Sequence, residues 1–134
     1  MSQILYTLQA LYQFYKSAHW LAKGELFYQY HLLFERLYEG FDEEMDQLVE
    51  LSLITGESSE KFKPQVIMQE AAKLMPQFSD SINNIQSAFN LEEQLLSTIE
   101  AIDAKSTPTG LYNHLAAIAQ AHTSKVYLLQ SSLK

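Results

Sequence analysis

Two histidines in the first quarter of the chain are the clearest candidates for chemistry. His19 and His31 are 12 residues apart, and Gly24, a residue type that favours turns, lies between them. If the chain reverses near Gly24, the histidines lie five residues before it and seven residues after it. At about 1.5 Å per helical residue, both are within roughly 7–11 Å of the turn along their helix axes. The two imidazoles can therefore face a common point, as metal ligands do.

A pair of carboxylates farther along the chain has the spacing of neighbours on one helix face. Asp46 and Glu50 are four residues apart, so one cation can contact both. His31 and Asp46, however, are 15 residues apart, which is on the order of 22 Å along one straight helix. Either the two pairs are unrelated, or a second, antiparallel copy brings its carboxylates to the first copy's histidines. A two-fold dimer would then hold two such sites, and Glu35, one turn after His31, would add a carboxylate.

The composition limits which ions and partners the chain can bind. It contains no cysteine, so any metal must be held by imidazole and carboxylate, a donor set that suits iron, manganese or zinc. The net charge is −7, from 9 Lys and Arg against 16 Asp and Glu, which argues against sequence-independent binding to DNA phosphates. With 47% apolar and 19% charged residues, one packed domain over residues 1–134 is expected. Since neither a membrane-spanning apolar run nor a secretory leader is visible, we expect a soluble, cytoplasmic protein.

Apolar residues recur at helical spacing along most of the chain, so the sequence predicts an all-α protein. The long helices are expected at residues 2–23, 26–54, 79–104 (or from 80) and 111–133, with a short helix at 65–75. The short helix lies between two prolines and lengthens the connection between the second and third long helices. These elements predict a four-helix bundle with one short extra helix in that connection. The second long helix is expected to place Phe27, Phe34 and Phe41 on its inner side.

The candidate ligands and their neighbours resemble the signature of the Dps family, the mini-ferritins of stressed bacteria. The matching pattern is His19-Trp20, then Gly24-x-x-Phe27-x-x-x-His31, then Asp46-x-x-x-Glu50. The resemblance implies a ferritin-like fold, a two-fold dimer that forms the metal sites, and a hollow dodecamer. It also implies Fe(II) oxidation at the two-fold interfaces, by hydrogen peroxide in preference to oxygen, with a ferric mineral stored inside. Such a protein would be a ferroxidase that stores iron and protects against oxidative stress.

The resemblance also assigns roles to individual residues. The catalytic iron ligands would be His19, His31, Asp46 and Glu50. Glu35 matches a position where an acidic residue often assists a second iron, and Trp20 matches a tryptophan beside the site. Iron, as a mono-iron or di-iron site, is therefore the expected cofactor, and zinc is the expected substitute.

The chain departs from this family's pattern near the carboxylates. Val49 and Leu51 replace an alanine and an arginine that are frequent on either side of Glu50. No lysine-rich segment lies at either end of the printed chain, so no DNA binding is expected. A second interpretation therefore stays open: a non-catalytic ferritin-like bundle, structural or protein-binding, with a vestigial or zinc-occupied site.

Two further histidines lie in the last predicted helix. His122 is in register with Leu115, Ile118 and Leu129, so we expect a hydrogen-bonded histidine in the core. His114 lies off that stripe and is expected to be exposed. None of the four histidines has a glutamate three residues before it, which argues against the intrachain Glu-x-x-His type of di-iron centre.

Overall fold

The protein is built from helices and turns, without a β-strand, in a computed structural model that describes residues 1–134. The α-helices are α1 (Ser2–Leu21), α2 (Phe27–Tyr38), α3 (Phe41–Ile54), α4 (Pro64–Leu74), α5 (Ser81–Glu100) and α6 (Thr109–Ser132). Two 3₁₀ turns, η1 (Ser59–Phe62) and η2 (Ala104–Ser106), lie in the connections. The predicted all-α class is confirmed.

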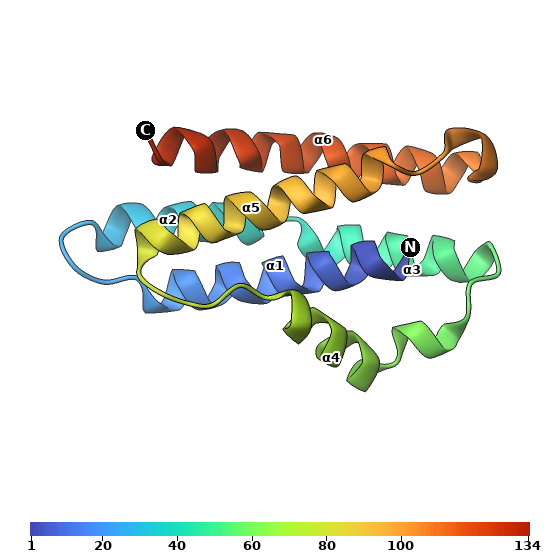
Figure 1. The fold of residues 1–134 in the computed structure, drawn as a ribbon, viewed down its shortest axis with the longest axis horizontal. Coiled ribbons are helices and arrows are strands. Elements are labelled where there is room, and N and C mark those ends of the chain that lie inside the picture. The colour runs from blue at the N-terminus through green and yellow to red at the C-terminus, as the bar shows by residue number, and fades with distance from the viewer.

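The long helices form a four-helix bundle in which α2 and α3 together occupy one of the four positions (Figure 1). α1 packs against α2, α3 and α5, and α6 packs against α3 and α5. The short helix α4 lies outside the bundle against α1, in the connection that leads from α3 to α5. The predicted bundle with one short extra helix in this connection is therefore confirmed.

A single apolar core joins all four positions of the bundle. Leu8, Phe34, Leu95 and Leu129 come from α1, α2, α5 and α6, and each is completely buried. Burying one such side chain stabilises the fold by about 1.5–3 kcal/mol. Phe27, which was predicted to lie on the inner side, is instead 40% exposed, because it begins α2 next to the turn rather than under the bundle.

The second predicted helix is two helices, which corrects the prediction of one helix over residues 26–54. α2 ends at Tyr38, Glu39 is extended (φ −64°, ψ 141°), and Gly40 has a left-handed φ of 86° before α3 begins. Only glycine adopts this conformation without strain. Three acidic residues in the first turn of α3 (Asp42, Glu43 and Glu44) favour a new helix start, because they interact with the positive end of its dipole.

The other helix boundaries lie within about a turn of the predicted ones. α5 begins after Asp80, whose side chain accepts the N–H of Asn83 at 2.9 Å, as expected of an N-cap. Its end at Glu100 precedes the predicted end, because residues 104–106 form the separate turn η2. No helix combines the length and apolar composition that crossing a lipid bilayer requires.

Candidate metal centre

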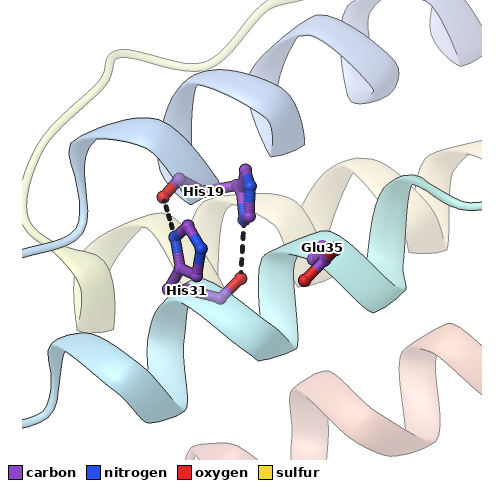
Figure 2. Close-up of side chains that lie close together, drawn as sticks. All are labelled: His19, His31 and Glu35. Atoms are coloured by element: carbon purple, nitrogen blue, oxygen red, sulfur yellow. Dashed lines mark hydrogen bonds between the residues drawn. The ribbon is translucent and has the colours of Figure 1, made fainter.

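A short turn brings the last helical residues of α1 next to the first residues of α2. α1 ends at Leu21, Ala22 is extended (φ −59°, ψ 144°), and Gly24 has a left-handed φ of 93° that lets the chain reverse. His19 lies just before this turn and His31 lies one turn into α2. The reversal therefore places the two imidazoles side by side (Figure 2).

Each of these histidines is hydrogen-bonded to the backbone of the other. Nδ1 of His19 lies 2.8 Å from the carbonyl oxygen of His31, and Nδ1 of His31 lies 2.8 Å from the carbonyl oxygen of His19 (Figure 2). A carbonyl oxygen only accepts, so both Nδ1 atoms carry the hydrogen and donate. In the neutral rings the lone pair is then on Nε2, the atom that is free to bind a metal.

The surrounding aromatic rings hold the two imidazoles in place. Their ring centroids are 3.8 Å apart and the rings are nearly parallel, at 22°. The ring of Phe27 also stacks on His31, with centroids 4.9 Å apart, and the rings of Tyr38 and His19 form an edge-to-face pair at 5.5 Å. Little side-chain entropy remains to be lost when a ligand binds, so the pair is preorganised.

A carboxylate completes a cluster of three candidate ligands in one chain. Potential donor atoms of His19, His31 and Glu35 all lie within 4.8 Å of one another, and all three side chains are half-buried. Glu35 is one helical turn after His31, so both point from the same face of α2 (Figure 2). Two neutral imidazoles and one carboxylate fit Fe(II), Fe(III) or Zn²⁺.

The remaining predicted ligands are not part of this cluster. Asp46 and Glu50 are exposed on α3, beyond the break at Gly40, and the cluster in one chain does not include them. Trp20 is 59% exposed beside His19, and the ammonium of Lys16 lies 5.4 Å from the centroid of its ring. One copy of the chain thus carries two groups of candidate ligands that do not meet.

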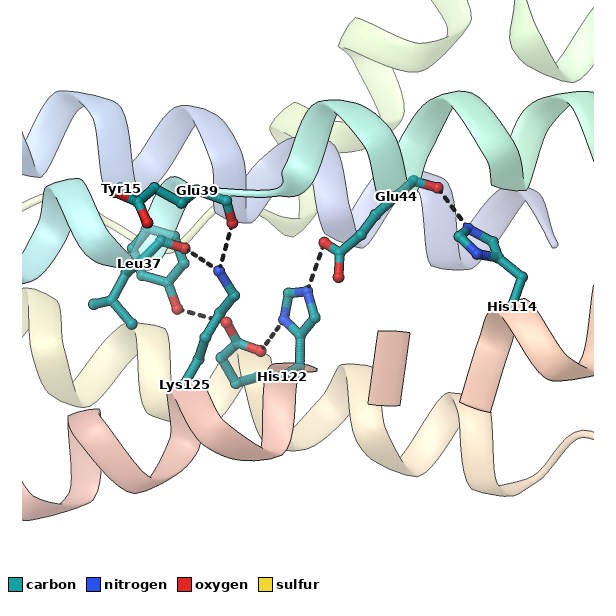
Figure 3. Close-up of polar contacts among 8 residues, drawn as sticks. Tyr15, Leu37, Glu39, Glu44, His114, His122 and Lys125 are labelled. Carbon is teal, nitrogen blue, oxygen red and sulfur yellow. Dashed lines mark hydrogen bonds and ion pairs between the residues drawn. The ribbon is translucent and has the colours of Figure 1, made fainter. Parts of the chain in front are cut away.

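A second polar cluster lies inside the bundle, built from one side chain of each helical position (Figure 3). Nδ1 of His122 donates to Glu92 at 2.6 Å, and Nε2 of His122 donates to Glu44 at 3.0 Å. The hydroxyl of Tyr15 donates to the other oxygen of Glu92 at 2.6 Å. His122 and Glu92 are completely buried, and the prediction of a hydrogen-bonded core histidine is confirmed.

This buried cluster is a set of hydrogen-bonded ionisable side chains centred on His122. Burial alone would lower the pKa of His122, but its hydrogen bonds to Glu44 and Glu92 and their negative charges raise it to about 9. The imidazole is therefore charged at neutral pH, and both of its nitrogens are committed to carboxylates. Burial and the neighbouring charge of Glu92 raise the pKa of Tyr15 well above its ordinary value, so this phenol stays neutral.

Sequence reasoning missed the carboxylates of this cluster. Glu44 follows Asp42 and Glu43 in an acidic run, and nothing in its spacing distinguishes it from them, yet it bonds to His122. Glu92 continues the stripe of Ala88, Leu95 and Ile99 on α5, and a charged residue on an apolar stripe was the signal that could have found it.

One histidine of α6 corrects an expectation. His114 was expected to be exposed, but it is half-buried and its Nε2 donates to the backbone carbonyl of Glu44 at 2.9 Å. This contact ties α6 to the first turn of α3.

The fold and the clusters together define a class: a four-helix bundle that carries histidine and carboxylate ligands on adjacent helices. Residues 2–124 match the sequence pattern of the ferritin-like domain, so the chain belongs to that family. Membership points to iron binding or storage, and the family includes ferroxidases. No curated protein matches the chain.

Proposed function

We propose that this chain is a Dps-type mini-ferritin that binds Fe(II) and oxidises it at sites shared by two copies. The observation that carries the proposal is the reciprocal Nδ1 hydrogen bonding of His19 and His31, which leaves two Nε2 lone pairs beside the Glu35 carboxylate. Metal-binding histidines commonly donate their other ring N–H to a backbone carbonyl or a carboxylate, which fixes the tautomer. A core-packing role would not require this arrangement.

Each site would combine two groups of residues. We call His19, His31 and Glu35 the histidine half, and Asp46 and Glu50 the carboxylate half. Both carboxylates are exposed on α3, and the ligand cluster within one chain does not include them. In a two-fold dimer, the histidine half of each copy would meet the carboxylate half of the other, which gives two equivalent sites.

Exposed apolar side chains supply a surface on which a second copy would pack. The cluster at the α1–α2 end of the molecule consists of Trp20, Leu21, Leu26, Phe27, Tyr28 and Leu32, each at least 40% exposed. Soluble monomers seldom expose a contiguous group of large apolar residues, and such a group usually marks an interface. Trp20 and Leu32 directly follow the two histidines in the sequence, and Phe27 stacks on His31, so this surface adjoins the histidine half, where a partner's carboxylates are needed.

The chemistry follows from the donor set. Anionic carboxylates and neutral imidazoles stabilise Fe(III) relative to Fe(II), so oxidation is favoured at the site. Hydrogen peroxide would take one electron from each of two Fe(II) ions, its O–O bond would break, and two protons would complete two water molecules. No hydroxyl radical is released by this route. Further assembly into a hollow dodecamer would provide the space for ferric mineral.

Fe(II) oxidation by purified protein tests the shared site. We expect rapid oxidation with peroxide, and a loss of about tenfold or more in His31→Ala and in Asp46→Ala, because each removes a ligand from both sites of the dimer. Glu43→Ala, which removes an exposed charge elsewhere on α3, is the matched control and is expected to leave the rate unchanged.

Co-expression of the two variants distinguishes a shared site from one within a single chain. A mixed dimer carries one intact site and one site that lacks both ligands. About half of randomly paired dimers are mixed, so co-expression is expected to restore about a quarter of the activity of the unchanged chain. No recovery, with both variants still dimeric, would rule out sharing. Oxidation no faster than in buffer, together with tight Zn²⁺ binding, would favour the non-catalytic, zinc-occupied bundle instead.

A further inference from the structure

The proposed ligands lie on both sides of the break between α2 and α3. His31 and Glu35 belong to α2, Asp46 and Glu50 belong to α3, and Gly40 separates the two helices. A continuous helix would set the distance between these groups through its own backbone hydrogen bonds. Across the break, contacts with another helix have to set the distance between these groups.

Lys125 of α6 makes such contacts at the end of α2. Its Nζ donates to the carbonyl of Leu37 at 2.6 Å and to the carbonyl of Glu39 at 2.9 Å (Figure 3). In an unbroken helix these carbonyls would accept the N–H groups four residues later, which belong to Phe41 and Glu43. The ammonium satisfies the acceptors that the break leaves open.

The same ammonium also lies against the first residue of α3. Its Nζ is 4.7 Å from the centroid of the Phe41 ring, and the Lys125 side chain is almost completely buried. Burial lowers its pKa below the ordinary value, opposed by the charges of Glu44, Glu92 and Glu39. A buried lysine whose two hydrogen bonds and ring contact are all made at one break has a specific role there rather than a solubilising one.

Two further side chains of α6 hold the other side of the break. His122 donates to the carboxylate of Glu44, and His114 donates to its backbone carbonyl (Figure 3). Glu44 is in the first turn of α3, two residues before Asp46. α6 therefore holds the end of α2 and the start of α3 at the same time.

We propose that Lys125 is a positioning residue for the metal site: by holding the end of α2 on α6, it sets the angle between α2 and α3. That angle determines the spacing between the histidine half and the carboxylate half, so this inference rests on the proposed function. Two-fold symmetry makes the requirement strict, because any change of angle in the chain displaces ligands at both sites of the dimer. Small displacements of ligands weaken a preorganised site strongly.

A distance measurement tests the positioning role without any metal. The chain has no cysteine, so spin labels at Arg36→Cys and Gln47→Cys, both exposed, report only the separation of α2 and α3. Labelled chains diluted with unlabelled ones give the distance within one copy. Lys125→Met keeps the length of the side chain and removes the donors. We expect a shifted or broadened distance distribution, and an unchanged one would overturn the proposal.

Binding of Co(II) to the full chain tests the consequence for the site, because its visible spectrum reports coordination geometry. We expect Lys125→Met to bind Co(II) about tenfold more weakly, with an altered spectrum. Leu129→Ala, which removes a buried side chain one turn later on α6, controls for lost stability and should keep the spectrum of the unchanged chain.

The outcomes separate the two proposals. Co(II) binding that is unchanged in Lys125→Met overturns the positioning role and leaves the shared site standing. An unchanged chain that binds no Co(II) overturns the metal site, and the positioning role with it. An equal loss of binding in Leu129→Ala would reduce Lys125 to a residue that only stabilises the fold.

Discussion

His122 carries a positive charge in the interior of the bundle, between the carboxylates of Glu92 and Glu44. With Lys125 nearby on α6, the two negative charges have two positive partners. Unpaired charges in such a place would be very unfavourable, whereas a fully hydrogen-bonded set specifies one arrangement of the helices. The same histidine makes stability depend on pH.

The pH dependence has a definite sign. The pKa of His122 is about 9 in the folded chain and near its ordinary value of 6.5 after unfolding. The folded state therefore binds the proton more tightly, which raises the free energy of unfolding. This stabilisation is complete below about pH 6.5 and is lost as the pH rises through about 9. A shift of this size corresponds to roughly 3 kcal/mol.

Urea unfolding at several pH values measures this contribution. We expect the stability difference between the unchanged chain and His122→Gln to shrink by a few kcal/mol between about pH 6.5 and 9. Because both chains contain the same other titratable groups, the contributions of those groups to stability cancel in the difference. A difference that stays constant over this range would show that His122 is not charged in the folded state.

At the scale of the elements, the break between α2 and α3 depends on one glycine. Gly40 has a φ of 86°, and an added Cβ there would meet no atom within 4 Å. A side chain at this position is therefore disfavoured by the backbone conformation alone, not by crowding. The same holds for Gly24 in the turn that brings the histidines together, where φ is 93°.

Gly40→Ala is expected to destabilise the fold by about 1–2 kcal/mol, because a left-handed conformation is costly for a residue with a Cβ. Gly110→Ala is the matched control: Gly110 lies within α6, and its added Cβ also meets nothing. Because Gly110 is the second residue of α6 and has no left-handed φ, alanine there is expected to leave the stability unchanged or to raise it slightly. The urea midpoint of each variant is compared with that of the unchanged chain. Equal shifts in the two variants would contradict the role given to Gly40.

At the scale of the whole molecule, the proposed dimer would link association to metal binding through the exposed apolar cluster at the α1–α2 end. The histidine half adjoins this cluster through Trp20, Phe27 and Leu32, so a partner that covers the apolar side chains would also exclude water from the ligands. Desolvated ligands bind a cation more strongly than exposed ones. Association and metal affinity are therefore expected to rise together.

Tyr28→Glu tests this coupling, because it places a charge on a side chain that is 67% exposed within the cluster. Sedimentation velocity is expected to show dissociation towards single chains of 15.4 kDa, with Fe(II) oxidation falling in parallel. Tyr127→Glu, at 63% exposure on α6, is the control and should leave the dimer intact. A Tyr28→Glu variant that stays dimeric would place the interface elsewhere.

Much of the architecture could be read from local patterns. Helical periodicity predicted the bundle and its short extra helix, because burial of an apolar stripe is a property that neighbours in sequence share. The pairing of His19 with His31 followed from Gly24, since a turn between two helices brings together residues at similar distances from it. His122 followed from its register with Leu115, Ile118 and Leu129 in the same way.

Tertiary structure decided the features in which several helices take part. The apolar stripe of Phe34, Leu37, Phe41 and Leu48 keeps its helical phase across Gly40, so periodicity alone does not reveal that Lys125 holds a break there. The partnership of Glu44 and Glu92 likewise arises only where α3, α5 and α6 meet. Local sequence determines which residues favour a helix or a turn. The energetics of a buried charge depend on the groups that the folded chain places around it.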